Sequence, residues 1–373
     1  MAMTFPTVGV IGAGQLARMM AVPANDLGIN LVVLADSAKD SAAQICSYVV
    51  GDYRNIEAVL TFAKACDVIT FEHELIPQPV IKELERQGVK VYPRSDSFIF
   101  SQNKIQMRKK MDELGLPNPK WQIFDGGDTN IVFPLIAKTP SGGYDGRGVY
   151  VVDSLAQLSV LHKQIAVPLL IEEKLKFDYE ISVMVARSPH GQASTWSPTL
   201  TVQTDGICTS TVTPVPKLSE ELLVRSQEIA LAIASGISLV GVMAVELFVV
   251  GEKLVINELA LRPHNSGHWS IEGSVTSQFE QHLRAILDLP LGSTQMRSRW
   301  AVMGNILGAE KTDMYRPFLH LMARTPALKF HHYRKVVRPG RKIGHVTLLG
   351  DDLLELEEEI GHAVDYLSGA IGE

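Results

Sequence analysis

The feature that most constrains the fold is VGVIGAGQLARMM, residues 8–20. Its first part has the apolar residues of a buried strand, Gly12 and Gly14 permit a tight turn, and the residues from Gln15 onward have a helical pattern. Free backbone N–H groups at the start of a helix attract anions. The stretch therefore predicts a strand, turn and helix that begin an α/β layer and offer an anion site.

This stretch also permits a second interpretation. Ala17 completes the G-x-G-x-x-G/A pattern of dinucleotide-binding folds, and Asp36 lies about 20 residues further on, where a ribose-binding acid is expected. A nicotinamide-dependent oxidoreductase would have both features. That interpretation explains only the first third of the chain and gives no role to the motifs that follow.

Alternating apolar runs and helical segments divide the chain into three parts. VGVIGA, INLVVLA, DVITFE and VKVYP predict a small parallel sheet, followed by the charged helix SQNKIQMRKKMDELG with Ser101 or Asn103 as its cap. VFPLIAK, GVYVVDS, PLLIEEKL and EISVMVAR predict a smaller lobe around a glycine loop. A hairpin, two helices and a basic tail complete the chain. We expect an α/β fold with domains at residues 1–103, 104–190 and 191–373.

Composition excludes several classes of protein. The formal net charge of −6 disfavours a general nucleic-acid binder, and the three cysteines are too scattered for a disulfide framework or a zinc site. No apolar run approaches the roughly 20 residues that span a bilayer, and MAMTFP lacks the features of a secretory signal. We expect a cytoplasmic protein with neither nucleic-acid nor membrane partners.

The glycine loop KTPSGGYDGRGV directly follows an apolar strand. Lys138 then leaves the sheet beside glycines that permit close approach of the backbone, an arrangement suited to polyphosphate. It is not a Walker A loop, because the lysine precedes the glycines. A solvated charge at a strand end is the alternative.

The turn in VVGEKLV decides which side chains face each other across the predicted hairpin. A two-residue turn places Glu246 opposite Asn257, whereas a three-residue turn places it opposite Glu258. Two opposed carboxylates repel unless a cation lies between them, and magnesium takes one or two carboxylates together with phosphates and water. The alternative is that one glutamate faces solvent.

Two polar segments could bind a substrate. LALRPHNSGHWS places Arg262, His264, Asn265 and His268 just beyond a strand, where hydrogen bonding to a polar substrate is favoured over zinc binding. YRKVVRPGRKIGH contains Lys335, Arg341 and Lys342 in a short basic run. The basic run is either a solvated charge cluster or a pocket for one phosphate monoester.

Taken together, GAGQLARMM, TFEHELIP, KTPSGGYDGRG, NELALRPHNSGHW and YRKVVRPGRKIGH resemble the ATP-grasp enzymes, and within them the 5-(carboxyamino)imidazole ribonucleotide synthase family. The resemblance covers nearly the whole chain. It implies an ATP-grasp fold with a Rossmann-like N-terminal domain, a small central lid domain and a mixed-sheet C-terminal domain. It also implies a homodimer that uses ATP, Mg²⁺ and bicarbonate to carboxylate 5-aminoimidazole ribonucleotide through carboxyphosphate, in purine synthesis.

The resemblance also implies roles for individual residues. Arg262, Asn265 and Lys138 would be catalytic, and Glu246 and Glu258 would bind the metal ion. The residues implied for ATP are Lys104, Lys138, Gly143, Tyr144, Asp145, Gly146, Glu172, Glu173, Leu175, Glu180, Asn257 and Glu258. The residues implied for the ribonucleotide are Gly14, Gln15, Leu16, Glu72, Tyr144, Arg147, His264, His268, Lys335, Arg341 and Lys342.

Two further alternatives share the nucleotide-binding scaffold. A formate-dependent glycinamide ribonucleotide transformylase is a sibling within the ATP-grasp group, but GGYDGRG and RPHNSGHW favour the carboxylating family. A nucleotide-binding regulator without catalysis is the other. The retained glutamates argue against it.

Overall fold

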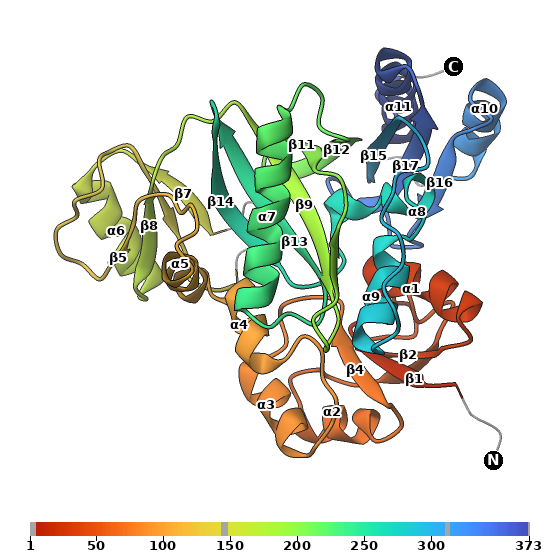
Figure 1. Ribbon diagram of the computed structural model, residues 1–373, viewed down its shortest axis with the longest axis horizontal. Coiled ribbons are helices and arrows are strands. Elements are labelled where there is room, and N and C mark those ends of the chain that lie inside the picture. The colour runs from red at the N-terminus through yellow and green to blue at the C-terminus, as the bar shows by residue number, and fades with distance from the viewer. Residues whose placement is uncertain (1–4, 143–147, 310–313, 372–373) are drawn as a thin grey trace.

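The computed structural model describes residues 5–142, 148–309 and 314–371, which form three sheets (Figure 1). The first sheet is parallel, in the order β3-β2-β1-β4. Its strands are β1 (Thr7–Ile11), β2 (Asn30–Ala35), β3 (Ser47–Val50) and β4 (Val68–Phe71). Its helices are α1 (Gln15–Asp26), α2 (Ile56–Ala63), α3 (Gln78–Arg86) and α4 (Ser95–Gln102). The predicted parallel α/β layer is therefore confirmed.

One predicted strand of this layer is wrong. VKVYP forms only a single bridge, between Val91 and Ile69, because Pro93 has no backbone N–H with which to extend the ladder. The fourth strand is instead β3, whose residues are exposed at the sheet edge. Its short and polar-flanked sequence gave no strong strand signal.

The second sheet is antiparallel, in the order β5-β8-β6-β7, and lies at the far left of Figure 1. Its strands are β5 (Trp121–Phe124), β6 (Leu135–Lys138), β7 (Val149–Val152) and β8 (Leu169–Glu173), with α6 (Leu155–Ile165) packed beside them. Helix α5 (Lys104–Glu113) connects this sheet to the first domain. Of the two predicted caps, Asn103 is the one observed, since its side chain accepts a hydrogen bond from Gln106 N, whereas Ser101 lies within α4.

The third sheet has nine strands within the described residues, and β14-β13-β9-β11-β12-β15-β17-β16 is its main order. These strands are β9 (Tyr179–Arg187), β10 (Ala193–Thr195), β11 (Thr199–Thr204), β12 (Ile207–Thr213), β13 (Gly241–Val250), β14 (Lys253–Ala260), β15 (Trp300–Leu307), β16 (Lys329–His332) and β17 (Lys342–Gly350). The helices of this region are α7 (Glu220–Gly236), α8 (Ser270–Gly273), α9 (Gln278–Ile286), α10 (Arg316–Arg324) and α11 (Leu353–Ser368), with a short 3-10 turn at Asn265–Gly267.

Two details of this sheet differ from expectation. Every pairing in it is antiparallel, whereas a mixed sheet is expected from the resemblance. The strand EISVMVAR, grouped by sequence with the middle lobe, is β9 and pairs with β13 and β11 in this sheet. Apolar alternation identifies a strand but carries no information about its partner, so sequence proximity misassigned it.

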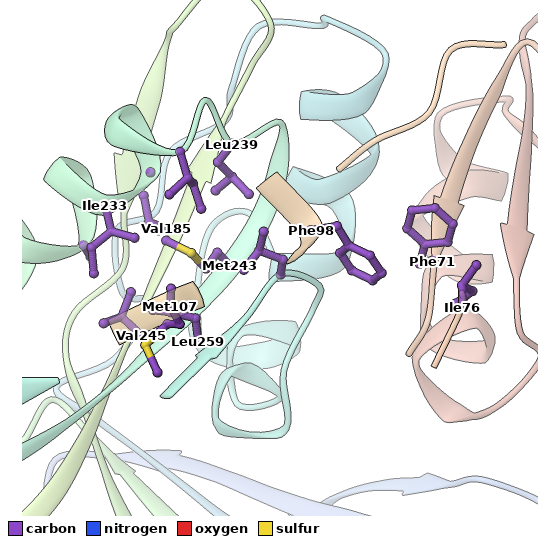
Figure 2. Close-up of a cluster of buried hydrophobic side chains, with 14 of the residues drawn as sticks. Phe71, Ile76, Phe98, Met107, Val185, Ile233, Leu239, Met243, Val245 and Leu259 are labelled. Carbon is purple, nitrogen blue, oxygen red and sulfur yellow. The ribbon is translucent and has the colours of Figure 1, made fainter. Parts of the chain in front are cut away.

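Helix α9 and a continuous core join the first domain to the large sheet. The α9 residues Phe279, Leu283 and Ile286 pack with apolar residues of α1 in one buried cluster. On the other side of the junction, Figure 2 shows the ring of Phe98 on α4 facing that of Phe71 on β4, with centroids 4.7 Å apart. The same buried cluster contains Met243 and Leu259 of the large sheet, and so fixes the first domain against the sheet that carries the glutamates. Within the described residues, every helix is too short or too polar to cross a bilayer.

Candidate active site

The two glutamates of the β13–β14 hairpin lie directly opposite each other, but not for the reason that turn length suggests. The turn has two residues, Gly251 and Glu252, since Val250 pairs with Lys253. That register alone would pair Glu246 with Asn257. A β-bulge shifts it, so that Leu247 pairs with Ile256 and Glu246 with Glu258. Asn257 is the extra residue of the bulge.

Opposed glutamates concentrate negative charge at this point. Burial, followed by the nearby charges of Glu258 and Glu180, raises the pKa of Glu246 to about 8. Lys104, at the start of α5, forms an ion pair with Glu258, and His264 Nε2 lies 3.6 Å from Glu246 Oε1. A cation between the carboxylates would relieve the repulsion that raises this pKa.

The donor set matches a small divalent ion that also binds phosphate. Across the described ranges, no three or more His, Cys, Asp and Glu side chains are grouped to hold a metal ion. A group of three or more such side chains is typical of structural metal sites. Mg²⁺ is instead usually bound by one or two carboxylates together with substrate phosphates and water. Glu246 and Glu258 fit the second description.

Lys138 and Glu172 form a buried cluster with Arg108, next to the bulge. Lys138 Nζ lies 2.7 Å from one carboxylate oxygen of Glu172, and Arg108 Nε donates to the other oxygen at 2.6 Å. Burial alone would raise the pKa of Glu172, but the two cations outweigh it and lower the pKa to about 2. Burial lowers the pKa of Lys138, and Glu172 opposes that shift. Two positive charges thus face one negative charge.

Among the other residues implied for ATP, Glu180 and Asn257 lie near this cluster. Glu180 on β9 pairs in register with Phe248, and therefore lies on the same sheet face as Glu246. Burial raises the pKa of Glu180. Asn257 Oδ1 lies 3.5 Å from Lys138 Nζ. Glu173 accepts a hydrogen bond from Lys120 N, and Leu175 follows β8 in a half-buried position.

The glycine turn of the first domain is closed by a carboxylate of the chain itself. Glu72, just after β4, accepts hydrogen bonds from the backbone N–H groups of Gly14 and Ala17 at the start of α1. A Cβ on Gly14 would lie 1.9 Å from Glu72 Oε1, so a larger residue there would displace the carboxylate. Leu16 is buried in the apolar cluster of this domain. The anion site predicted at the helix start is therefore filled by Glu72.

Cations from the far end of the chain lie beside this turn. Lys335 Nζ donates to Gln15 Oε1, and its charge acts on Glu72. Arg262 Nε donates to Glu74 Oε2 at 2.8 Å. Arg341 is exposed and donates to Val336 O, and Lys342 begins β17. The tail segment thus brings Lys335 to the glycine turn, which supports its interpretation as part of a phosphate pocket.

The histidines and asparagine after β14 are held by neighbouring polar groups. Gln278 accepts from His264 N and donates to His268 Nδ1 at 3.0 Å, which leaves the proton of neutral His268 on Nε2. Burial lowers the pKa of both histidines well below the ordinary value. Asn265 and Asn305 exchange two amide hydrogen bonds, of 2.9 and 2.7 Å. The side chain of Asn265 is thus engaged within the protein.

The structure brings together Lys104, Lys138, Glu172, Asn257, Glu246 and Glu258 on one side, and Gly14, Gln15, Glu72 and Lys335 on the other. Arg262 contributes to the charge environment of both Glu72 and Glu246, which connects the two groups. The predicted residues Gly143, Tyr144, Asp145, Gly146 and Arg147 lie outside the described residues.

Sequence reasoning missed three residues that organise this site: Arg108, Asn305 and Gln278. A signal exists for Arg108, because it follows Lys104 by four residues and so shares its helix face. Asn305 and Gln278 lie in ordinary strand and helix patterns, and no local signal distinguishes them.

Comparison with known proteins supports the family that the sequence motifs resemble. The family models that match are the ribonucleotide synthetase preATP-grasp domain (residues 5–102), the ATP-grasp domain (109–279) and the phosphoribosylaminoimidazole carboxylase C-terminal domain (301–359). N5-carboxyaminoimidazole ribonucleotide synthase from Mycobacterium tuberculosis is 41% identical, over 97% of this chain and 88% of its own length. The enzyme of that name from Corynebacterium ammoniagenes is 39% identical, over 98% and 92%.

Solved structures agree closely with this chain. The N5-carboxyaminoimidazole ribonucleotide synthetase from Thermus thermophilus has a TM-score of 0.88 at 34% identity, and 98% of this chain and 99% of that chain are covered. An Aspergillus clavatus N5-carboxyaminoimidazole synthase in complex with ADP and 5-aminoimidazole ribonucleotide has a TM-score of 0.88 at 30% identity, with the same coverage.

The fold and the paired lysines and glutamates define an ATP-grasp enzyme, which confirms the predicted fold class. The extent of the similarity narrows the class. This chain belongs to the N5-carboxyaminoimidazole ribonucleotide synthase family.

Proposed function

We propose that this chain catalyses the ATP- and bicarbonate-dependent carboxylation of 5-aminoimidazole ribonucleotide to N5-carboxyaminoimidazole ribonucleotide, a step in purine synthesis. The observation that carries the proposal is the pairing of Glu246 with Glu258 next to Lys104 and Lys138, in a chain that is similar to members of this family over 97% of its length. These residues supply the charges that phosphoryl transfer needs.

In the first step, a bicarbonate oxygen attacks the γ-phosphorus of ATP, the bond to the β,γ-bridging oxygen breaks, and carboxyphosphate and ADP form. Lys104 and Lys138 bind the phosphate oxygens and stabilise the charge that develops on them. Glu246 and Glu258 would hold Mg²⁺, which would supply further neutralisation of the phosphate charge. Arg262, held by Glu74, orients the bicarbonate-derived group.

In the second step, the exocyclic amine of the ribonucleotide attacks the carboxyl carbon and the bond from that carbon to the phosphate oxygen breaks. Inorganic phosphate leaves and takes up the proton that the amine loses. Gln15, Glu72 and Lys335 lie together at the glycine turn and hold the ribonucleotide there. Lys335 provides the positive charge for its phosphate, while the glycine turn provides a close approach of the backbone. The long separation of Gln15 and Lys335 in sequence means that only the folded chain has this site.

The proposal is tested by ADP release from purified protein. ADP should appear only with Mg²⁺ and bicarbonate together, and the ribonucleotide should stimulate its release. Replacement of bicarbonate by formate should abolish the signal, and a formate-dependent signal would instead support the transformylase alternative. Tight ATP binding without any ADP release would support a regulator. Absence of bicarbonate-dependent ADP release would refute the proposal.

We also propose that the protein is a homodimer, as the family resemblance implies. Sedimentation equilibrium of the purified chain should give twice the mass of 40.9 kDa. A single-chain mass at micromolar concentration would refute this part of the proposal and leave the catalytic part intact.

A further inference from the structure

Arg108 is a buried charged residue to which the reaction described above assigns no role. It lies on α5, one turn after Lys104, and its side chain is fully buried. It makes four hydrogen bonds to oxygen atoms of three separate segments. Because an unpaired buried charge is costly, a guanidinium this fully satisfied indicates a specific placement.

The first set of contacts reaches the bulge. Arg108 Nη1 donates to the carbonyl oxygen of Ile256 at 2.7 Å, and Nη2 donates to that of Asn257 at 2.8 Å. These are the two residues at which the register of β14 shifts relative to β13. Since β14 is the edge strand and Ile256 N donates to Pro117 O, this side of β14 has no strand partner. The planar guanidinium binds two of its carbonyl oxygens at once, on either side of the register shift.

The bulge decides where the metal-site carboxylates lie. Without the extra residue, the two-residue turn would place Asn257 opposite Glu246, and Glu258 would point to the other face of the sheet. The residue that holds the bulge therefore also holds Glu258 beside Glu246.

The second contact set reaches the phosphate lysine. Arg108 Nε donates to one oxygen of Glu172, whose other oxygen pairs with Lys138. With Arg108 present, the three side chains carry a net charge of about +1 at neutral pH. Without it, Lys138 and Glu172 would form a neutral pair, and less positive charge would face a phosphate.

We propose that Arg108 is a positioning residue for the nucleotide site, which fixes the β14 bulge that places Glu258 opposite Glu246 and shares Glu172 with Lys138. The inference rests on the magnesium and nucleotide part of the proposed function. It predicts that Arg108 controls how strongly Mg²⁺ and nucleotide binding depend on each other, although its side chain does not contact solvent.

The test compares Arg108→Gln, Arg108→Lys and the wild type by calorimetric titration of ADP with and without Mg²⁺. We expect Arg108→Gln to weaken ADP binding in Mg²⁺ by about thirtyfold and to remove most of the enhancement by Mg²⁺. Arg108→Lys keeps the charge but lacks the planar fork that reaches both carbonyl oxygens, so its affinity for ADP in Mg²⁺ should fall by about tenfold. Arg187→Gln is the matched control. Arg187 also donates to a backbone carbonyl, that of Leu239, but it lies at the end of β9 opposite to Glu180.

Thermal unfolding and far-UV circular dichroism identify variants that remain folded. A folded Arg108→Gln protein whose Mg²⁺ enhancement equals that of the wild type would overturn the inference. If Arg108→Gln does not fold, the same titration of Arg108→Lys tests the inference. An enhancement of ADP binding by Mg²⁺ equal to that of the wild type would then overturn it. These titrations contain neither bicarbonate nor ribonucleotide. A wild type that couples Mg²⁺ to ADP but never carboxylates would therefore refute the proposed function alone.

Discussion

The glycine turn and the glutamate hairpin each contain a buried glutamate whose pKa is raised by burial, but the two carboxylates face different groups. At the turn, the partial positive charge of the start of α1 is neutralised by Glu72, a residue of the same domain. At the hairpin, Glu246 faces Glu258, and the charges of Glu258 and Glu180 add to the effect of burial in raising its pKa to about 8. The backbone N–H groups of the helix start are thus bound within the chain, whereas the two facing carboxylates need a cation.

This difference explains why a complete dinucleotide pattern is misleading here. The pattern G-x-G-x-x-G/A describes a turn and a helix start, and both are present. A pyrophosphate needs the backbone N–H groups that Glu72 occupies. A local motif thus predicts local geometry, whereas two facing carboxylates, one of them with a raised pKa, indicate where a cation binds.

The largest predicted effect is at the hairpin. Glu258→Gln removes one metal-binding charge and the partner of Lys104, so we expect kcat to fall by about a thousandfold. Steady-state ADP release measures it. Glu252→Gln, in the exposed turn of the same hairpin, is the control and should retain wild-type kcat. Wild-type turnover in Glu258→Gln would contradict the role of the hairpin.

The next largest effect concerns the buried lysine. Lys138→Met keeps much of the side-chain volume but removes the charge, leaving Glu172 paired with Arg108 alone. We expect kcat/KM for ATP to fall by about a hundredfold, with little change in the KM for the ribonucleotide. Lys163→Met, at an exposed position of α6 in the same lobe, is a suitable control. An equal loss in both variants would indicate a nonspecific effect.

A smaller and selective effect is expected at the glycine turn. Gly14→Ala places a methyl group against Glu72 and forces that carboxylate to move. We expect the KM for the ribonucleotide to rise by about thirtyfold, because the displaced groups include Gln15 and its partner Lys335. The KM for ATP should not change. A rise in the KM for ATP instead would show that the turn acts on ATP binding and not on ribonucleotide binding.

The smallest effect concerns the junction between the two regions. His282 Nδ1 accepts from Val242 N on β13, and Nε2 lies 2.8 Å from Thr70 Oγ1 on β4. Burial lowers the pKa of His282 to about 3, from an ordinary value of 6.5. Its neutral form is therefore favoured in the folded state. The stabilisation is complete above pH 6.5 and is lost as the pH falls from 6.5 towards 3.

Each pH unit in that range should cost about 1.4 kcal/mol of unfolding free energy through His282. Urea unfolding at pH 7.5 and 5.5 measures the change in the wild type and in His282→Gln. The variant should show a smaller loss between the two values. Equal losses of unfolding free energy in both proteins would show that protonation of His282 does not cause the loss of stability.

Much of this site could be predicted from sequence, because charged residues at strand and helix ends are visible as such. Lys138 after an apolar strand and the two glutamates of the hairpin are examples. The bulge was not predictable, since the turn length alone predicts that Glu246 pairs with Asn257, and no local pattern marks the extra residue. The placement of β9 and the pairing of Asn265 with Asn305 were equally hidden, because both depend on partners distant in sequence.

The most direct test is a crystal structure with a non-hydrolysable ATP analogue and magnesium. The account predicts one metal ion bound by carboxylate oxygens of both Glu246 and Glu258, at about 2.1 Å, and by phosphate oxygens of the analogue. Lys138 should lie within hydrogen-bonding distance of the same phosphates. A triphosphate bound at the glycine turn of β1 and α1, with no metal ion between the two glutamates, would contradict it.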